Sequence, residues 1–357
     1  MKKLTFAAIL IAMSATGAYA AGGAKPLDSR LFSPVADVPL GPAANRIDYQ
    51  SLDAGARRLY VSLMGAGKLL VFDIDANKPL RQLDGFPKTT GVLVVPSLHR
   101  VYSSVPGAGL GPSLNVGLGM LGLSSGHGAV AIVDTDSLHE IARLPGGVFP
   151  DGIAYDPKDN RIFVSDEMGS AISVVDAASS RLTARIAAGG EVGNVQYDPV
   201  SAMLYAPIQT RNEIGIFDPA RSRRTASYPL TGCKHPHGLA IAPGAAIGYV
   251  ACDENDVLVT VDLKDGKELS HLPLGHDPDV LAIDPGLKRL YVASESGNLS
   301  SFDIANPRAP VALGDSLIGP HAHSVAVDPV THRLFLPLAD LQGRSVMRIV
   351  APNAAGH

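Results

Sequence analysis

The sequence predicts an all-β fold, a seven-bladed β-propeller with four antiparallel strands in each blade. Three observations predict it: a recurring aromatic strand, recurring Asp-Pro turns, and a composition of 37 Gly, 27 Pro and no Trp among 357 residues. Such a composition favours short strands joined by tight turns. The aromatic positions, spaced by 42, 61, 42, 44, 42 and 44 residues, are Tyr60, Tyr102, Phe163, Tyr205, Tyr249, Tyr291 and Phe335. A period in the low forties is typical of a four-stranded blade.

Each repeat contains the same parts in the same order. A first apolar strand leads into a turn such as Asp156-Pro157, where proline cannot donate a hydrogen bond to a strand ladder. The aromatic strand follows, then a loop and a third strand. The third strand ends in aspartate, at Asp73, Asp134, Asp176, Asp218, Asp262 and Asp303. A fourth strand, as in residues 269–274, completes the blade.

The two ends of the chain are expected to close the ring. The seventh repeat has three recognisable strands and no fourth, whereas residues 35–41 resemble an isolated fourth strand. Pairing that N-terminal strand with the last blade would leave no sheet edge exposed there. The alternative is a ring of six blades with loose ends.

Residues 1–20 have the layout of a secretory signal peptide. Lys2 and Lys3 precede an apolar run to Met13, and a small-x-small cleavage site ends at Ala20. We therefore expect a periplasmic or secreted protein whose residues 21–357 form a single propeller domain. We also expect a monomer without membrane insertion. A retained N-terminal anchor is the alternative. The formal net charge of −4 and the lack of a Lys/Arg cluster argue against nucleic acid as a partner.

The repeated strand resembles a known motif. Segments such as Arg58-Leu59-Tyr60-Val61 and Arg289-Leu290-Tyr291-Val292, followed by a Val-x-Asp strand, resemble the YVTN repeat. The mature chain as a whole is similar to the YncE-like family of exported seven-bladed propellers. The resemblance implies the fold and not the function, because propellers carry many unrelated activities.

Aligning the repeats on the Asp-Pro turn identifies one position per blade at the start of the channel-lining strand. In blade order it is Asp48, Thr90, Asp151, Gly193, His237, Asp279 and His323. Blades five, six, seven and one are neighbours in a closed ring, so His237, Asp279, His323 and Asp48 are expected to form one arc. Imidazole and carboxylate together suit one divalent ion such as Zn, Mn, Fe or Cu. The alternative is that these side chains bond the backbone of their own turns.

Further candidates lie around this arc. Two residues earlier stand Arg46, His235, Asp277 and His321, and residues two apart on an extended strand point the same way. His235 or His321 could then act as a general base. The loops after the aromatic strands add Asp166, Glu167, Cys252, Asp253, Glu254 and Glu295. Asp151, Glu167 and Glu295 are candidates for binding a polar ligand. The alternative is that they are solvated loop acids.

Two other features belong to the same face. The Gly-rich segment from Pro106 to His127 accounts for the long spacing in blade two, and we interpret it as a flap over the channel mouth or as an insertion without a role. Cys233 and Cys252 lie on neighbouring strands of blade five, and in an oxidising compartment they are expected to form a disulfide. Free thiols and metal ligation remain the alternatives.

These observations favour an exported binding protein that presents a metal or a small polar ligand, or docks an exported partner protein, at the mouth of its channel. The alternative is a metal-dependent lactone hydrolase or lyase that uses the same His/Asp cluster, by analogy with other propellers. A third hypothesis, an accessory to an exported redox enzyme, rests on resemblance between propellers alone.

Overall fold

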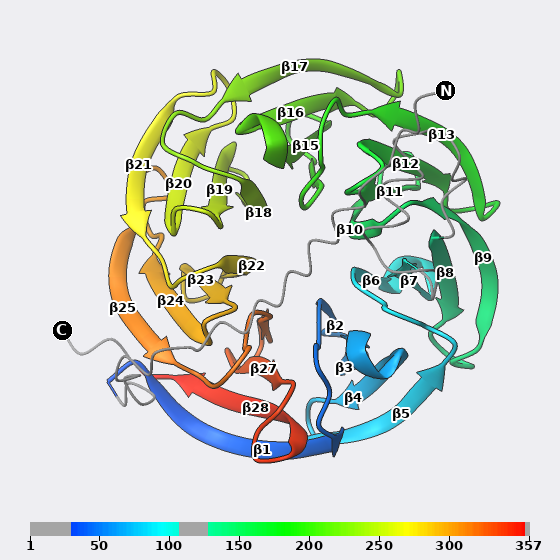
Figure 1. Cartoon of the computed structure of the whole chain (residues 1–357), viewed down its shortest axis with the longest axis vertical. Coiled ribbons are helices and arrows are strands. Elements are labelled where there is room, and N and C mark those ends of the chain that lie inside the picture. Colours follow the sequence, from blue (N-terminus) through cyan, green and yellow to red (C-terminus); the bar gives the residue numbers. More distant parts are fainter. Residues whose placement is uncertain (1–29, 107–127, 354–357) are drawn as a thin grey trace, which may run out of the picture.

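The computed structural model describes residues 30–106 and 128–353. Within these ranges seven four-stranded antiparallel sheets surround a central channel, with the first strand of each blade innermost (Figure 1). The predicted seven-bladed propeller is therefore confirmed. In the described part of the chain, no helix has the length and apolar character needed to cross a bilayer.

The blades follow one another in sequence order. Blade one contains β2 (Gln50–Asp53), β3 (Arg58–Leu63), β4 (Lys68–Asp73) and β5 (Lys78–Asp84); blade two contains β6 (Val92–Val95), β7 (Arg100–Val105), β8 (Gly128–Asp134) and β9 (Glu140–Gly147). Blade three contains β10 (Pro150–Asp156), β11 (Arg161–Asp166), β12 (Ala171–Asp176) and β13 (Arg181–Ala187); blade four contains β14 (Gln196–Asp198), β15 (Met203–Ile208), β16 (Glu213–Asp218) and β17 (Arg223–Pro229). Blade five contains β18 (Pro236–Ala242), β19 (Ile247–Cys252), β20 (Val257–Asp262) and β21 (Glu268–Pro273); blade six contains β22 (Pro278–Asp284), β23 (Arg289–Ser294), β24 (Asn298–Asp303) and β25 (Val311–Leu317). Blade seven contains β26 (Ala326–Val327), β27 (Leu334–Leu338), β28 (Arg344–Pro352) and β1 (Phe32–Pro42), and short 3-10 turns occupy Met64–Ala66, Pro96–Leu98 and Gln209–Arg211.

The ring is closed by the N-terminal strand, as predicted. β1 lies antiparallel to β28, with Phe32 opposite Pro352 and Pro42 opposite Arg344. Figure 1 shows the two strands side by side, although they lie at opposite ends of the chain. Blade seven therefore has its fourth strand, and no ladder of this blade is left unpaired on that side.

Packing between blades explains the repeated aromatic strand. The second and third strands are buried on both faces because neighbouring blades stack against them, so they read as continuous apolar runs. The aromatic residues lie in these interfaces, and Tyr60, Phe163 and Phe335 are fully buried. At the closing interface the Phe72 and Phe335 rings are 6.3 Å apart, edge to face. The outer fourth strands alternate in exposure, as in β13, because only one of their faces is covered.

The Asp-Pro turns also join neighbouring blades. Asp328 of the blade-seven turn accepts hydrogen bonds from the Arg57 guanidinium of blade one at 2.7 and 2.9 Å. Asp284 of blade six is bonded in the same way to His332 of blade seven, with a distance of 2.8 Å from Nδ1 to the carboxylate. The turn aspartate is thus a clamp between blades as well as a turn residue.

Candidate functional site

The blade-to-blade connections deliver one side chain per blade to the channel mouth. In blades three, five and six the connection ends at a proline that begins the first strand, and the side chain after it enters the channel: Asp151, His237 and Asp279. Asp48 precedes β2, and His323 precedes β26. The structure brings the arc of His237, Asp279, His323 and Asp48 together, and Asp151 lies against it.

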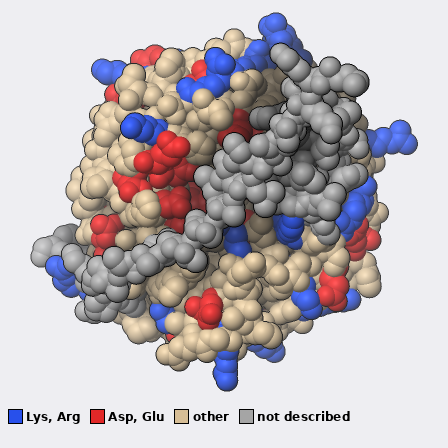
Figure 2. Space-filling view, viewed as in Figure 1, with Lys and Arg blue, Asp and Glu red and all other residues tan. Residues whose placement is uncertain are grey.

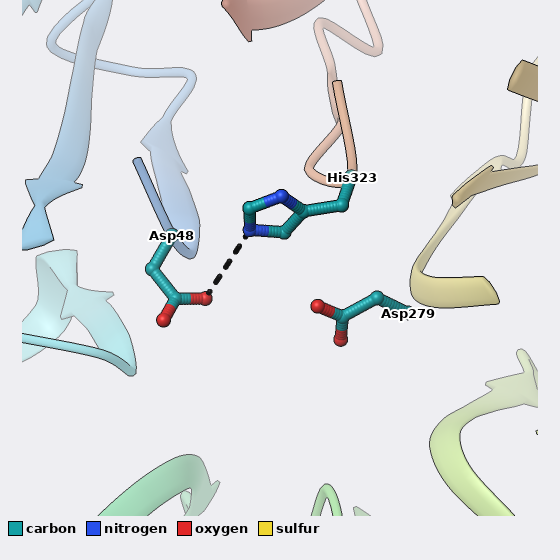
Figure 3. Close-up of side chains that lie close together, drawn as sticks. All are labelled: Asp48, Asp279 and His323. Atoms are coloured by element: carbon teal, nitrogen blue, oxygen red, sulfur yellow. Dashed lines mark ion pairs between the residues drawn. The ribbon is translucent and has the colours of Figure 1, made fainter. Parts of the chain in front are cut away.

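The tightest group in this arc is Asp48, Asp279 and His323. One potential ligand atom from each lies within 4.8 Å of the others. In Figure 3 the three side chains point from three separate blades toward one centre, and His323 Nε2 stands 3.8 Å from Asp48 Oδ1. All three residues are buried, His323 with an exposed fraction of 1%.

Several polar atoms of this group lack hydrogen bonds. Asp48 Oδ1, Asp279 Oδ1 and both ring nitrogens of His323 are buried without a hydrogen-bond partner among the described residues. Buried polar atoms in native proteins are rarely left so, because an unpaired group loses its hydration without compensation. The second oxygens of both aspartates face Arg46, at 3.6 Å for Asp48 Oδ2 and 3.5 Å for Asp279 Oδ2.

Arg46 is the counter-ion of this half of the site. Its guanidinium also contacts Glu295, whose other oxygen lies 3.3 Å from His323 Nδ1. Burial by itself would lower the pKa of Arg46, but Asp48, Asp279 and Glu295 raise it above its ordinary value. The arginine therefore stays charged and holds the three carboxylates in place.

His237 occupies the other half of the site. Its Nε2 lies 3.4 Å from Asp279 Oδ1, 4.0 Å from Asp151 Oδ2 and 3.4 Å from the Tyr49 hydroxyl. Its Nδ1 lies 3.3 Å from Gln209 Oε1. Asp279 thus stands between the two imidazoles of the arc.

The carboxylates set the charge of both histidines. Burial lowers the pKa of each imidazole, but the negative charge of Asp279 raises that of His237 to about 10, and Asp48 with Glu295 raise that of His323 to about 10. Burial works against ionisation of Asp279 too, yet the adjacent histidines lower its pKa below the usual range. Burial and the neighbouring Glu167 raise the pKa of Asp151 well above its usual value. At neutral pH both imidazoles are therefore protonated when no cation is bound, and a metal ion would displace their protons.

A cavity of about 320 Å³ opens onto this cluster. Acidic side chains dominate its polar wall: Asp48, Asp151, Glu167, Asp253, Asp277, Asp279 and Glu295. Figure 2 shows acidic side chains gathered on this face over blades five and six. Concave, acidic surroundings of this kind focus the electrostatic field on cations.

The backbone at His235 and His321 differs from the extended strand assumed for them. Both residues have positive φ, 52° and 54°, so the connection is not extended at these positions and the alternation of an extended strand does not apply to them. His235 still lines the cavity, with its Nδ1 2.8 Å from Asp253 Oδ2. The His321 side chain is 55% exposed, and its Nδ1 lies 3.9 Å from Glu295 Oε2.

A second ring of positions surrounds the first, directly after the second strand of each blade. Glu167, Asp253 and Glu295 occupy it and line the cavity, as does Gln209, which sequence reasoning missed. Aligning the second strands, as was done for the first, would have identified Gln209, whose amide nitrogen donates to Glu167 at 2.8 Å. Glu254, the residue after Asp253, is exposed.

Asp166 has a structural role instead. It is paired with Arg185 and accepts hydrogen bonds from the backbone of Val148 and Phe149, at 2.9 and 2.8 Å. It is fully buried and fixes the connection that enters blade three. The interpretation of Asp166 as part of an outer ligand shell is therefore not supported.

Cys233 and Cys252 form a disulfide, as expected, with their Cα atoms 5.3 Å apart. It joins the connection that carries His235 and His237 to the end of β19. The signal peptide and the flap, apart from Pro106, lie outside the described residues. Residues 122–126, within that segment, read Gly-x-Ser-x-Gly, a motif found around the nucleophilic serine of some hydrolases.

Comparisons with known proteins inform the fold and not the function. No family model and no curated protein matches this chain. Among solved structures, a chain of Kuenenia stuttgartiensis hydrazine synthase is similar, with a TM-score of 0.70 and 15% sequence identity, over 89% of this chain and 97% of that one. At such low identity the likeness shows that the two chains share the propeller fold.

Proposed function

We propose that the protein binds a divalent metal ion at its channel mouth through Asp48, Asp279 and His323. The observation that carries the proposal is the convergence of buried donor atoms that have no hydrogen-bond partner among the described residues. A cation at that point would satisfy these atoms together, which neither a hydrogen-bonded turn nor a solvated acid explains.

The surroundings suit such an ion. Two carboxylates and an imidazole are compatible with Zn, Mn or Fe. Arg46 and Glu295 contact the ligands from behind and would fix their orientation. When bound, the metal would supply Lewis acidity at the mouth, while the chain's own residues position a ligand in the cavity.

We further propose that the protein is an exported binding protein whose metal site receives a small polar ligand. Support comes from the cavity of about 320 Å³ beside the cluster, which is large enough for a small molecule. The Lys2-to-Ala20 segment and the buried disulfide agree with export. The resemblance to YncE-like propellers, which rests on the repeated strands, agrees with it too, and so does docking of an exported partner on this face.

Metal titration of the stripped protein tests the first proposal. Chelator-treated protein titrated with Zn²⁺ in a calorimeter should bind it, and His323→Ala should weaken binding by roughly 100-fold or more. His139→Ala is the matched control, because it removes an exposed imidazole from a turn on the opposite face. Equal Zn²⁺ affinity in all three proteins would refute the proposal.

A hydrolase or lyase is the second candidate, favoured by one observation. His235 lines the cavity and is held by Asp253, the arrangement of an imidazole general base oriented by a carboxylate. Metal-loaded protein would then open lactones, and His235→Ala would lower turnover while leaving Zn²⁺ affinity unchanged. If the protein bound metal but turned over none of a panel of lactones and esters, the hydrolase or lyase would be refuted and the binding function would stand.

A further inference from the structure

We propose that the ligand of the channel mouth is a small primary amine, whose ammonium group lies between Asp151 and Glu167. The inference names the ligand class of the proposed binding protein and so rests on that function. Both carboxylates line the cavity of about 320 Å³ and lie outside the group of Asp48, Asp279 and His323.

The Asp151 carboxylate is the observation that carries the inference. Asp151 is only 4% exposed, and among the described residues no hydrogen-bond donor reaches its carboxylate. The one charged group in contact with it is His237, whose Nε2 lies 4.0 Å from Asp151 Oδ2 and closer to Asp279 Oδ1, at 3.4 Å. A buried carboxylate is normally hydrogen-bonded, so the missing donors are expected from a ligand in the cavity.

Glu167 forms the second side of this site. A neutral amide holds it, because Gln209 Nε2 donates to Glu167 Oε1 at 2.8 Å. Burial and repulsion from Glu167 raise the pKa of Asp151, so the two carboxylates act on each other as like charges. An ammonium ion between them would offset both charges and donate to both carboxylates.

The cavity as a whole offers acceptors rather than donors. Seven carboxylates line it, and its charged donors are Arg46, His235 and His237. Arg46 already contacts three of the carboxylates, and His235 Nδ1 lies 2.8 Å from Asp253 Oδ2. Such a wall suits a ligand that donates hydrogen bonds and accepts none, and an ammonium group has three donors and no acceptor. A carboxylate or phosphate ligand would be repelled instead.

The same cavity has apolar side chains for the body of the ligand. Phe149 and Met64 line it and are partly buried, and Phe149 precedes Asp151 by two residues. Apolar side chains beside a pair of carboxylates suit methylene groups attached to an ammonium ion. The volume of about 320 Å³ is near the lower end of small-molecule pockets, about 300–1,000 Å³, so a short alkylamine fits the site.

Calorimetric titration with butylammonium chloride tests the inference. Full-length protein stripped of metal by a chelator should bind butylammonium at one site at pH 7, whereas 1-butanol and butyrate should not bind. Tetramethylammonium carries the charge without an N–H donor and should bind at least about tenfold more weakly. Absence of butylammonium binding would overturn the inference, and so would equal binding of the two cations.

Two charge-removing variants locate the ammonium group. Asp151→Asn and Glu167→Gln keep the side-chain size, and each should weaken butylammonium binding by about tenfold or more. Asp84→Asn is the matched control, because Asp84 is exposed near Lys68 on the outer strand of blade one. Circular dichroism checks that each variant is folded. Unchanged affinity in folded Asp151→Asn and Glu167→Gln, or an equal loss in Asp84→Asn, would refute the site.

Parallel Zn²⁺ titrations separate this inference from the metal proposal. Zn²⁺ binding without butylammonium binding would overturn the amine site and leave the metal site. Butylammonium binding to protein that takes up no Zn²⁺ would refute the metal site and keep the ligand class. Butylammonium binding that appears only after Zn²⁺ is added would place the amine nitrogen on the metal, and the site between Asp151 and Glu167 would be wrong.

Discussion

The two ends of the central channel are built from the same seven strands and differ in chemistry. At one end the strands begin with charged side chains around a cavity of about 320 Å³. Toward the Asp-Pro turns the same strands enclose a cavity of about 480 Å³, whose wall includes Leu52, Leu93, Ile153 and Ile283. Three residues separate Asp279 from Ile283 on β22. The strand start is available for ligand chemistry, and the remainder of the strand packs the ring.

Tyr49 lies between the two cavities and lines both. It enters from blade one and donates to Asn194 Oδ1 of blade four at 2.6 Å, with His237 of blade five 3.4 Å away. A side chain from one side of the ring therefore reaches the opposite side, and it separates the charged end from the end whose lining residues are uncharged.

Breaking the closed ring should affect both ends and give the largest effect. Phe335→Ala removes a fully buried ring from the interface of blades seven and one, and should lower the free energy of unfolding by about 3–5 kcal/mol. Urea denaturation measures it, with the exposed Val330→Ala as the control expected to change little. A loss below about 1 kcal/mol would mean that this interface contributes little to closure.

Acid should destabilise the protein at the Asp-Pro end of the channel by breaking the ion pair between Arg57 and Asp328. Arg57 contributes to a lowered Asp328 pKa, about 2 against 3.8, although burial alone would raise it. A lowered carboxyl pKa gives stability that is present above pH 3.8 and lost as pH falls through about 2. The shift corresponds to about 2 kcal/mol. Asp328→Asn should remove this pH dependence from urea denaturation curves between pH 5 and 2, and an unchanged slope would contradict the assignment.

The charged end should oppose stability when no cation is bound. Burial and repulsion from Glu167 disfavour ionised Asp151, so Asp151→Asn should raise the free energy of unfolding of stripped protein by about 1 kcal/mol at pH 7. Ile153→Ala, two residues along the same strand in the other cavity, should lower it. Thermal melts compare the stabilities of the two variants. If both variants were more stable than the unmodified protein, or neither were, the two ends of the channel would not differ as described.

Changing Tyr49, the residue between the two cavities, should give the smallest effect. Tyr49→Phe removes the hydroxyl that bonds Asn194 while keeping the ring, and should cost about 1 kcal/mol or less. Zn²⁺ affinity should stay within about threefold of the unmodified protein, because the hydroxyl is outside the Asp48, Asp279 and His323 group. Urea denaturation and calorimetry check both statements. A large loss of affinity would make Tyr49 part of the metal site.

Much of the fold could be predicted because it repeats. The aromatic period fixed the number of blades, and residues 35–41 indicated the closing strand that the structure contains in β1. The position five residues before the turn identified Asp48, His237, Asp279 and His323, since the same register brings equivalent residues to one end of the channel. Arg46 was placed on the connection, but its contacts with three carboxylates were not foreseen.

The sequence by itself determined the blades, their order and which residue types reach the mouth, because a local repeat with a fixed period gives every blade the same register. Only the tertiary structure decided which side chains meet. The backbone is left-handed at His235 and His321, which the strand pattern did not foresee, and ring closure set Asp279 between two imidazoles. Local patterns encode strands and turns, whereas contacts across a ring depend on angles accumulated over all seven blades.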